Sequence, residues 1–434
     1  MSLLLVAALI FFVTLVLVIR QPFGFNSAVW STLGAAAAWA TNVVSLHDIP
    51  LVWHIVQDAT FTLIALILIS LVLDAAGVFE WAALHMAHWA QGRGMRLFFL
   101  LNILSAVMAA LFTNDGAVLI MTPLLVGLSR RLQWSAAATL AVVMSGGFMA
   151  DAASLPFKTS NLVNIIAANQ SNIGFVTYVH HMWWVNASAV LLSMGVLWAY
   201  FRHDLPTHFV EVDMPSPRSA IKNVLIWRAA WVLMPVLMLG YLLSQSWRLP
   251  VSAVAIPGAL VMVMLAARSH DAHQSAVIPV RTLLREAPWQ VVVFSLGMYL
   301  VVYGLGKQGM TAWLAGELSL VQSASLPVAS LVTGVFAAAL SSMMNNLPAV
   351  LVLSLAIAHS QLTPVLHQSM VYASIIGCDL GPKITPLGSL ATLLWLHILA
   401  QRGIYIGWGM YFRTGVVLTL PVLVLTLWVS AWMN

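Results

Sequence analysis

The sequence predicts an all-α polytopic membrane protein built from two inverted repeats, each with five transmembrane helices, a re-entrant hairpin and a broken helix. The composition supports this fold class, because the 434 residues are 61% hydrophobic and only 7% charged, whereas a soluble domain carries roughly 25% charged residues. Apolar runs of spanning length also recur along the chain. Two of these runs are interrupted by aspartate, lysine and proline, at 151–161 and 379–389.

The composition also narrows the classes of function. A net charge of +5 would suggest a nucleic-acid partner in a soluble chain, but here it fits positive loops on the cytoplasmic side of a lipid bilayer. The single cysteine, Cys378, excludes a disulfide within the chain. Patterns typical of a phosphate loop, a metalloprotease or a nucleophile elbow do not occur in the sequence. We therefore expect a membrane transporter rather than an enzyme, with no cofactor, no metal site and no nucleic-acid partner.

The first repeat is expected over residues 1–201. Its spans are predicted from the apolar runs at 3–19, 28–45, 52–73 and 178–201, with a broken helix at 135–168. The segment 80–91 has helical apolar spacing but is too short to span, so we expect it to lie at the membrane surface.

Residues 97–128 allow two interpretations. The run is apolar except at its middle, where Thr113, Asn114, Asp115 and Gly116 lie together. It could form two full spans joined by a loop, or the two half-depth arms of a re-entrant hairpin. Each arm has roughly 16 residues, which is slightly short for a full span and favours the hairpin.

The second half repeats this order of elements. The stretch 202–228 holds seven charges and three prolines and is predicted to be a cytoplasmic linker. The second repeat follows over 229–434, with spans at 229–246, 251–267, 289–305 and 411–433, a short segment at 311–321, a hairpin at 326–359 and a broken helix at 365–400. In this repeat Asn114 corresponds to Asn345, 231 residues later, and Asp151 corresponds to Asp379, 228 residues later.

The distribution of positive charge tests this topology. Each half has an odd number of crossings, so the second half must be inverted relative to the first. Fourteen of the eighteen Lys and Arg residues then lie on one side and only Arg248 and Lys307 on the other, and positive charge marks the cytoplasm. Both termini are therefore predicted on the outer, periplasmic side. The hairpin tips and the broken helices are expected to meet near the middle of the bilayer, as in inverted-repeat transporters.

The breaks are expected to form the functional site. Proline interrupts a helix, and irregular backbone at membrane depth is tolerated only where it is buried in protein or lines a cavity. Three carboxylates lie at this depth, Asp115, Asp151 and Asp379, and an ionisable group there indicates function. We interpret them as proton-coupling groups. The alternative is that each carboxylate caps a half-helix or neutralises a lysine.

Small amide and hydroxyl side chains gather at the same tips and breaks: Asn114, Ser160, Asn161, Asn345, Asn346, Thr385 and Ser389. Each can donate and accept hydrogen bonds, which suits a neutral polyhydroxy ligand or a dehydrated cation. The alternative is that they satisfy backbone groups freed by the breaks. Lys158 and Lys383 are interpreted as charge partners of the aspartates, with attraction of an anion as the alternative. Cys378 is interpreted as a small packing residue.

Several of these stretches resemble the arsenite efflux pump family, the ArsB-type transporters. They read FEWAALH, ALFTNDGAVLIMTP, ADAASLPFKTSNLVNI, APWQVVVFSLGMYLVVYGL, SSMMNN and GCDLGPKITPLGSLATLLWLH. The resemblance runs nearly end to end and implies the fold of the wider ion transporter superfamily. It implies secondary active efflux of arsenite and antimonite across the bacterial inner membrane, in exchange for protons and by alternating access. Some members also associate with a soluble arsenite-stimulated ATPase, which is thus an optional partner.

The resemblance assigns the site to Asn114 with Asp115, to Asn345 with Asn346, and to the two breaks. Arsenite at neutral pH is an uncharged trihydroxide, so its binding would depend on hydrogen bonds and its uphill export on a coupled ion. Lys158 departs from the family, in which an apolar residue is expected there. A sodium–proton antiporter using the same carboxylates is the first alternative function, and a carboxylate carrier using the lysines is the second. An intramembrane aspartyl protease would leave the repeats unexplained.

Overall fold

The computed structural model describes residues 2–209, 214–269, 278, 280–287 and 289–433. Within these ranges the regular structure consists of helices, apart from one isolated bridge between Arg93 and His208. Eight helical segments of the described chain are long and apolar enough to cross a membrane. The predicted all-α membrane fold is therefore confirmed.

The first half contains nine α-helices among its described residues. They are α1 (Leu3–Arg20), α2 (Ser27–Ala40), α3 (Asp48–Ala75), α4 (Val78–Ala90), α5 (Gly94–Phe112), α6 (Asn114–Arg131), α7 (Ala136–Ala152), α8 (Leu162–Gln170) and α9 (Phe175–Phe201). Several helices begin where a side chain caps the first turn, as when Asn26 accepts from the backbone N–H of Val29 and Ser135 from that of Ala138. Such caps satisfy donors that have no partner inside the helix.

The second half starts with a helix whose first residue, Val224, lies before the apolar run predicted to begin at residue 229. Its described helices are α10 (Val224–Trp247), α11 (Ser252–Ala267), α12 (Val280–Glu286), α13 (Trp289–Leu305), α14 (Thr311–Ser319), α15 (Leu326–Met344), α16 (Asn346–His359), α17 (Pro364–Leu380), α18 (Leu390–Gln401) and α19 (Trp408–Trp432). The end of the predicted linker, 224–228, is helical because the Asn223 side chain caps α10 through the Ile226 N–H at 3.0 Å. The short helix α12 was not predicted from the sequence.

Both hairpins turn at one residue with positive φ. Thr113 joins α5 to α6 with φ 73° and ψ 152°, and Asn345 joins α15 to α16 with φ 79° and ψ 150°. Thr113 and Asn345 are therefore equivalent, which makes Asn346 the counterpart of Asn114. The sequence pairing of Asn114 with Asn345 was wrong by one residue, because it matched amide side chains rather than the backbone turn. A β-branched residue such as Thr113 adopts this region only at a cost in strain.

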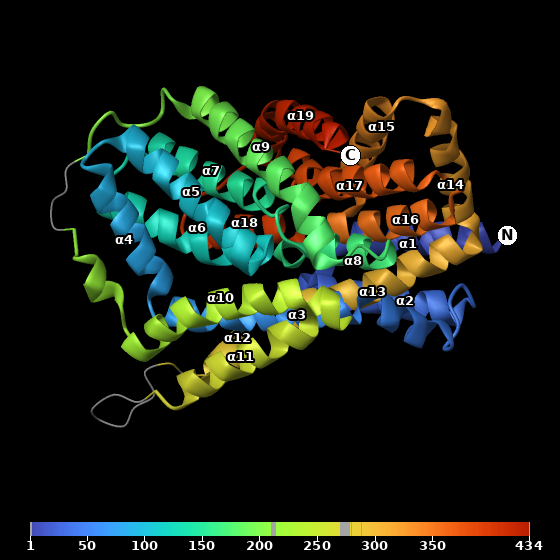
Figure 1. Cartoon of the computed structure of the whole chain (residues 1–434), viewed down its shortest axis with the longest axis horizontal. Helices are drawn as coiled ribbons and strands as arrows, with labels where there is room; N and C mark the ends of the chain where they lie inside the picture. The colour runs from blue at the N-terminus through green and yellow to red at the C-terminus, as the bar shows by residue number, and fades with distance from the viewer. Residues whose placement is uncertain (1, 210–213, 270–277, 279, 288, 434) are drawn as a thin grey trace.

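The helices form two layers when the molecule is viewed down its shortest axis. Helices α2, α3 and α10–α13 lie in the lower layer of Figure 1, and α5–α9 and α15–α19 lie in the upper layer. Helices α2 and α3 pack on α13 and α11 in the lower layer, while α15 packs on α17, α9 on α19 and α6 on α18 in the upper layer. Both hairpins and both broken helices belong to the upper layer, so the candidate site is built within it.

Charged residues mark one end of the molecule. At the end where α4 and the segment after α9 lie in Figure 1, Arg131 pairs with Glu80 at 3.2 Å and Arg130 donates to the backbone oxygen of Arg402. The N-terminus lies at the opposite end in Figure 1.

Candidate functional site

The two broken helices each place one aspartate at the end of their first segment. α7 ends one residue after Asp151, and α17 ends one residue after Asp379. The second segments, α8 and α18, are capped by Asn161 and Ser389. These caps have closely similar backbones, with φ −152° and ψ 148° for Asn161 and φ −143° and ψ 140° for Ser389. The two breaks therefore follow one local plan.

Both aspartate side chains are buried and hydrogen-bonded. Asp151 is 5% exposed and Asp379 is 2% exposed. Asp151 Oδ1 accepts from Asn114 Nδ2 at 3.1 Å, which ties the first hairpin tip to the first break. Asp379 Oδ1 accepts from Asn161 Nδ2 at 2.6 Å, which ties the two breaks to each other. Buried carboxyl groups are tolerated only with such partners, so these amides also decide how easily each carboxyl holds a negative charge.

Ser154 also connects the two breaks, and Asn164 holds the backbone of the first break; neither residue was among the predicted site residues. Ser154 Oγ lies 2.8 Å from the backbone oxygen of Asp151 and 3.4 Å from Asp379 Oδ2, so its single proton can be donated toward either aspartate. Asn164 Nδ2 donates to the backbone oxygens of Ser154 and Phe157, at 2.8 and 3.1 Å. The signal that could have identified Asn164 is an amide in the first turn of α8, among apolar neighbours and three residues after Asn161.

Asp115 lies beside this network without joining it directly. It lies in the first turn of α6, where the positive end of the helix dipole favours a carboxylate. Its backbone N–H donates to Asn114 Oδ1 at 2.8 Å. The side chain is half-buried and lies within electrostatic range of Asp151 and of the Tyr299 hydroxyl. The three predicted carboxylates are thus near neighbours, each within electrostatic range of another.

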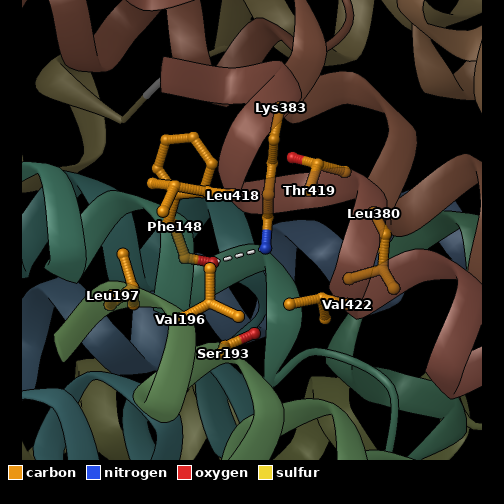
Figure 2. Close-up of a pocket in the computed structure, with 9 residues that line it drawn as sticks. All are labelled: Phe148, Ser193, Val196, Leu197, Leu380, Lys383, Leu418, Thr419 and Val422. Atoms are coloured by element: carbon orange, nitrogen blue, oxygen red, sulfur yellow. Dashed lines mark hydrogen bonds between the residues drawn. The ribbon is translucent and has the colours of Figure 1, made fainter. Parts of the chain in front are cut away.

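Lys383 connects the second break to α7. Its ammonium group donates to the backbone oxygen of Phe148 and lies 5.6 Å from the centroid of the Phe148 ring (Figure 2). Two small cavities adjoin it, each of about 10 Å³, which is about the space of one water molecule. Thr419 lines the first of these cavities and Asp151 the second. Lys383 is within electrostatic range of Asp151 and Asp379. Its role as their charge partner stays a prediction.

Lys158 lies away from both aspartates of the breaks. Its ammonium group donates to the backbone oxygen of Ile173 at 3.1 Å. The carboxylate within its electrostatic range is Asp58 of α3, which the sequence analysis did not consider. Lys158 and Asp58 line one crevice of about 1010 Å³ between α3, α8 and α10. Among the described residues, neither Lys158 nor Lys383 forms an ion pair with a carboxylate.

The hydroxyl groups of the predicted set bind backbone atoms in this conformation. Ser160 Oγ donates to the Ala110 oxygen at 2.6 Å, and Thr385 Oγ1 donates to the Ser342 oxygen. Ser389 Oγ accepts from the Ala391 N–H at 3.2 Å. These contacts favour the alternative that the hydroxyls satisfy backbone groups freed by the breaks, while a role in binding substrate stays a prediction.

The amides at the second hairpin tip also bind locally. Asn345 Oδ1 accepts from the Leu347 N–H at 3.3 Å, and the Asn346 N–H donates to the Gly388 oxygen at 2.9 Å. The second tip therefore touches the second break through its backbone, whereas the first tip touches the first break through the Asn114 side chain. This difference breaks the local symmetry of the two halves.

The arrangement offers two buried carboxyl groups surrounded by amides and one hydroxyl. Such a set can take up and release protons, and its remaining donors and acceptors can hydrogen-bond a small neutral ligand. The small cavities leave room for about one water molecule each, so a ligand would enter only after the helices rearrange.

Comparisons with known proteins agree along the whole chain. The family model described as arsenical pump membrane protein, ArsB, matches residues 6–433. Arsenical pump membrane proteins of Escherichia coli (strain K12) and Yersinia enterocolitica are 49% and 47% identical to this chain, over 98% of it and 97% of theirs. A putative arsenical pump membrane protein of Bacillus subtilis (strain 168) is 30% identical over 96% of both chains.

A solved structure supports the fold. The crystal structure of the Alcanivorax borkumensis YdaH transporter, described as having an unusual topology, superposes with a TM-score of 0.57. It covers 99% of this chain and 97% of its own, at 14% sequence identity. At 14% identity, this similarity shows a shared fold and nothing about function.

Proposed function

This chain belongs to the arsenical pump membrane protein family, and on that premise we propose that it exports arsenite and antimonite in exchange for protons by alternating access. The chain has several membrane spans and belongs to a bacterial pump family, which is consistent with a location in the inner membrane. The observation that carries the proposal is the pair of buried carboxyl groups, Asp151 and Asp379, held by Asn114, Asn161 and Ser154. Proton uptake by these carboxyls would drive the export of an uncharged substrate.

The substrate chemistry fits the amide-rich surroundings. Arsenite is a neutral trihydroxide, which needs donors and acceptors in comparable numbers rather than a fixed charge. Asn114, Asn161, Asn345 and Asn346 provide both kinds of group, and each hydrogen bond contributes about 0.5–1.5 kcal/mol net. A few such bonds bind weakly enough for rapid release, which a pump requires.

The local likeness of the two halves supports the proposed inverted repeats, 1–201 and 229–434. The tips turn at Thr113 and Asn345 with matching backbones, and the breaks are capped at Asn161 and Ser389 with matching backbones. Inverted repeats allow two related conformations in which the same site faces opposite sides of the membrane. We propose that Asp151 and Asp379 exchange protons with one side in each conformation.

The proposed orientation puts the arginine-rich end in the cytoplasm and the termini in the periplasm. A separate soluble ATPase would then meet the pump at the end that carries Arg130, Arg131 and the linker. Proton exchange by this chain does not require such a partner. Export by the purified protein without the ATPase would therefore indicate that the proton gradient supplies the energy.

Everted membrane vesicles test the proposed exchange. An imposed proton gradient should drive uptake of arsenite by vesicles that contain the wild-type protein, and a sodium gradient should not. Asp379→Asn removes the titrating group and keeps a similar shape, so proton-driven uptake should fall by about a hundredfold, the scale of a lost proton-transfer group. Asp204→Asn, at an exposed position, is the matched control and should transport normally.

Two results would contradict the proposal. Normal uphill transport by Asp379→Asn would mean that this carboxyl is structural. Sodium movement driven by the proton gradient, without uptake of arsenite, would support the sodium–proton antiporter alternative, in which the same carboxylates are cation ligands.

A further inference from the structure

Lys383 is a buried cation that is held by a backbone oxygen rather than by a direct ion pair. The residue is 3% exposed, and its ammonium group donates to the backbone oxygen of Phe148 in α7 (Figure 2). The face of the Phe148 ring, which attracts cations, lies 5.6 Å from the same nitrogen. An ammonium group has three donors and no acceptor, so Lys383 has donors left for other oxygen atoms.

Polar side chains line both of the small cavities that adjoin Lys383. One cavity is lined by Asp151, Thr392 and Tyr411. The other is lined by Thr419, whose hydroxyl is buried and has no hydrogen-bond partner among the described residues. Carboxylate and carbonyl oxygens are the ligands that hard metal cations prefer. The surroundings of the ammonium group therefore resemble the oxygen shell of a bound cation.

Asp379 lies on the same side of the second break as the ammonium group. The backbone stays helical from the end of α17 into the turn Gly381–Ile384, and residues four positions apart on a helix share a face. Both side chains also reach the first broken helix. Asp379 Oδ2 lies 3.4 Å from Ser154 Oγ, and Lys383 contacts the Phe148 oxygen. Lys383 is thus placed between the two breaks, with one carboxyl group from each of them nearby.

We propose that the Lys383 ammonium group occupies a cation site between the two breaks and thereby excludes sodium from it. The nitrogen takes the position of an alkali cation among the Phe148 oxygen and the carboxyl groups of Asp151 and Asp379. A proton still binds, because it attaches to a carboxyl oxygen and needs no oxygen shell of its own. Lys383 is therefore the residue that makes the exchange selective for protons.

Two effects of the ammonium group keep sodium out. It already uses the Phe148 oxygen as an acceptor, so this ligand is not free. Its positive charge also repels a second cation, and this repulsion is strong in the low-dielectric interior of a protein. Replacing Lys383 by a neutral side chain of similar length removes both effects and leaves the surrounding oxygen atoms in place. The selectivity rests on the proposed proton exchange, whereas the occupied cation site can be tested without transport.

Thermal unfolding of the purified protein tests the cation site with sodium as the probe. Sodium chloride should raise the unfolding temperature of Lys383→Met by about 2 °C relative to an equal concentration of choline chloride, the scale of a weakly bound ligand. The reason is that sodium then takes the position left by the ammonium group. Lys383→Ala should respond to sodium in the same way. The wild-type protein should unfold at the same temperature in both salts.

Lys158→Met is the matched control. Lys158 is also buried, and its ammonium group also donates to a backbone oxygen, that of Ile173. It lines the crevice beside Asp58 instead of the cavities between the breaks. Sodium should therefore not stabilise this variant. Adding Asp151→Asn to Lys383→Met should abolish the effect of sodium, because it removes a carboxylate ligand from the site.

The outcomes separate the cation site from the proposed function. Stabilisation of the wild-type protein by sodium would overturn the inference, and this measurement does not depend on how well a variant folds. Equal unfolding temperatures of Lys383→Met in the two salts would overturn it as well. If the wild-type protein does not exchange arsenite for protons, the proposed function fails and the role in proton selectivity fails with it, while the comparison of salts still decides whether Lys383 fills a cation site.

Discussion

Asn161 satisfies backbone freed by the first break, which is one of the two alternatives that the sequence left open, and it also contacts a buried carboxyl group. Its Oδ1 accepts from the Val163 N–H at 3.2 Å and caps α8, while its Nδ2 donates to Asp379 at 2.6 Å. An amide can do both because its two ends have opposite hydrogen-bonding character. One side chain therefore stabilises the broken backbone and also contacts the buried carboxyl of the other half.

A serine at this position separates the two roles. Serine caps a helix about as well as asparagine, but it is too short to reach Asp379. Asn161→Ser should keep the protein level near normal and remove a hydrogen bond to an ionisable group, worth about 1.5–3 kcal/mol. We expect arsenite efflux from cells to fall by roughly tenfold, since about 1.4 kcal/mol corresponds to a factor of ten. Unchanged efflux would show that the contact with Asp379 is dispensable.

Cys378 gives a second prediction at the residue scale. Soft metalloids favour sulfur, yet the Cys378 thiol is fully buried and its Sγ lies 4.0 Å from the backbone oxygen of Ala337 in α15. A single thiolate would also form a tight bond that slows release. Cys378→Ala should therefore retain arsenite resistance in cells, while Asn114→Ala, which removes the partner of Asp151, should reduce it. Loss of transport by Cys378→Ala at normal protein level would make sulfur a ligand.

At the scale of elements, the second break depends on close packing against α15. The backbone of Gly381 is helical, with φ −56° and ψ −42°, so glycine is not required there for its conformation. It is required for space, because a Cβ atom would meet the backbone of Ala338 and the hydroxyl of Ser341. Ser342 Oγ donates to the Gly381 oxygen at 2.7 Å across the same contact.

Gly381→Ala should therefore destabilise the protein by overpacking. Inserting a methyl group into a packed contact costs about 1–3 kcal/mol, so the purified protein should unfold at a lower temperature. Gly409→Ala in α19 is the control, because a Cβ atom there meets nothing within 4 Å and alanine is the better helix former. Equal stability of the two variants would mean that α15 and the second break can move apart at no cost.

At the scale of the whole molecule, contacts across the layers hold the present conformation. Asp58 of α3 accepts from Asn169 Nδ2 of α8 across the layers at 3.0 Å, and from the Ser252 N–H of α11 within the lower layer at 2.9 Å. Gln245 of α10 accepts from the Val176 N–H of α9 at 2.8 Å. The two bonds between the layers lie at the crevice lined by Asp58, Asn169 and Gln245, so a movement that separates the layers there would have to break them.

The orientation of the molecule in the membrane is open to a direct measurement. Ser219, between α9 and α10, and Ser323, between α14 and α15, are both exposed. In a Cys378→Ser background, a single cysteine at 323 should react with an impermeant thiol reagent on intact cells, and one at 219 should react only after the membrane is opened. Reaction at 219 alone in intact cells would reverse the predicted orientation.

The sequence by itself determined the class of the protein and indicated where a candidate site lies. Low charge and long apolar runs allow only a helical membrane protein, because backbone groups in lipid must be paired within the chain. Proline, glycine and aspartate inside such runs are costly enough to mark Asp151 and Asp379 as functional candidates. The charge distribution added an expected orientation, and the motifs identified the family.

Only the tertiary structure decided which groups meet. Asn161 reaches Asp379 across 218 positions of sequence, and Lys383 reaches the Phe148 oxygen across 235. Ser154 is one of several small polar residues in the first break, and only packing places its hydroxyl 3.4 Å from Asp379 Oδ2. The pairing of Thr113 with Asn345 likewise depends on backbone angles rather than on side-chain identity. The local sequence indicates which secondary structure a segment favours and which side chains are costly to bury. The partner of a buried group depends instead on how the helices pack.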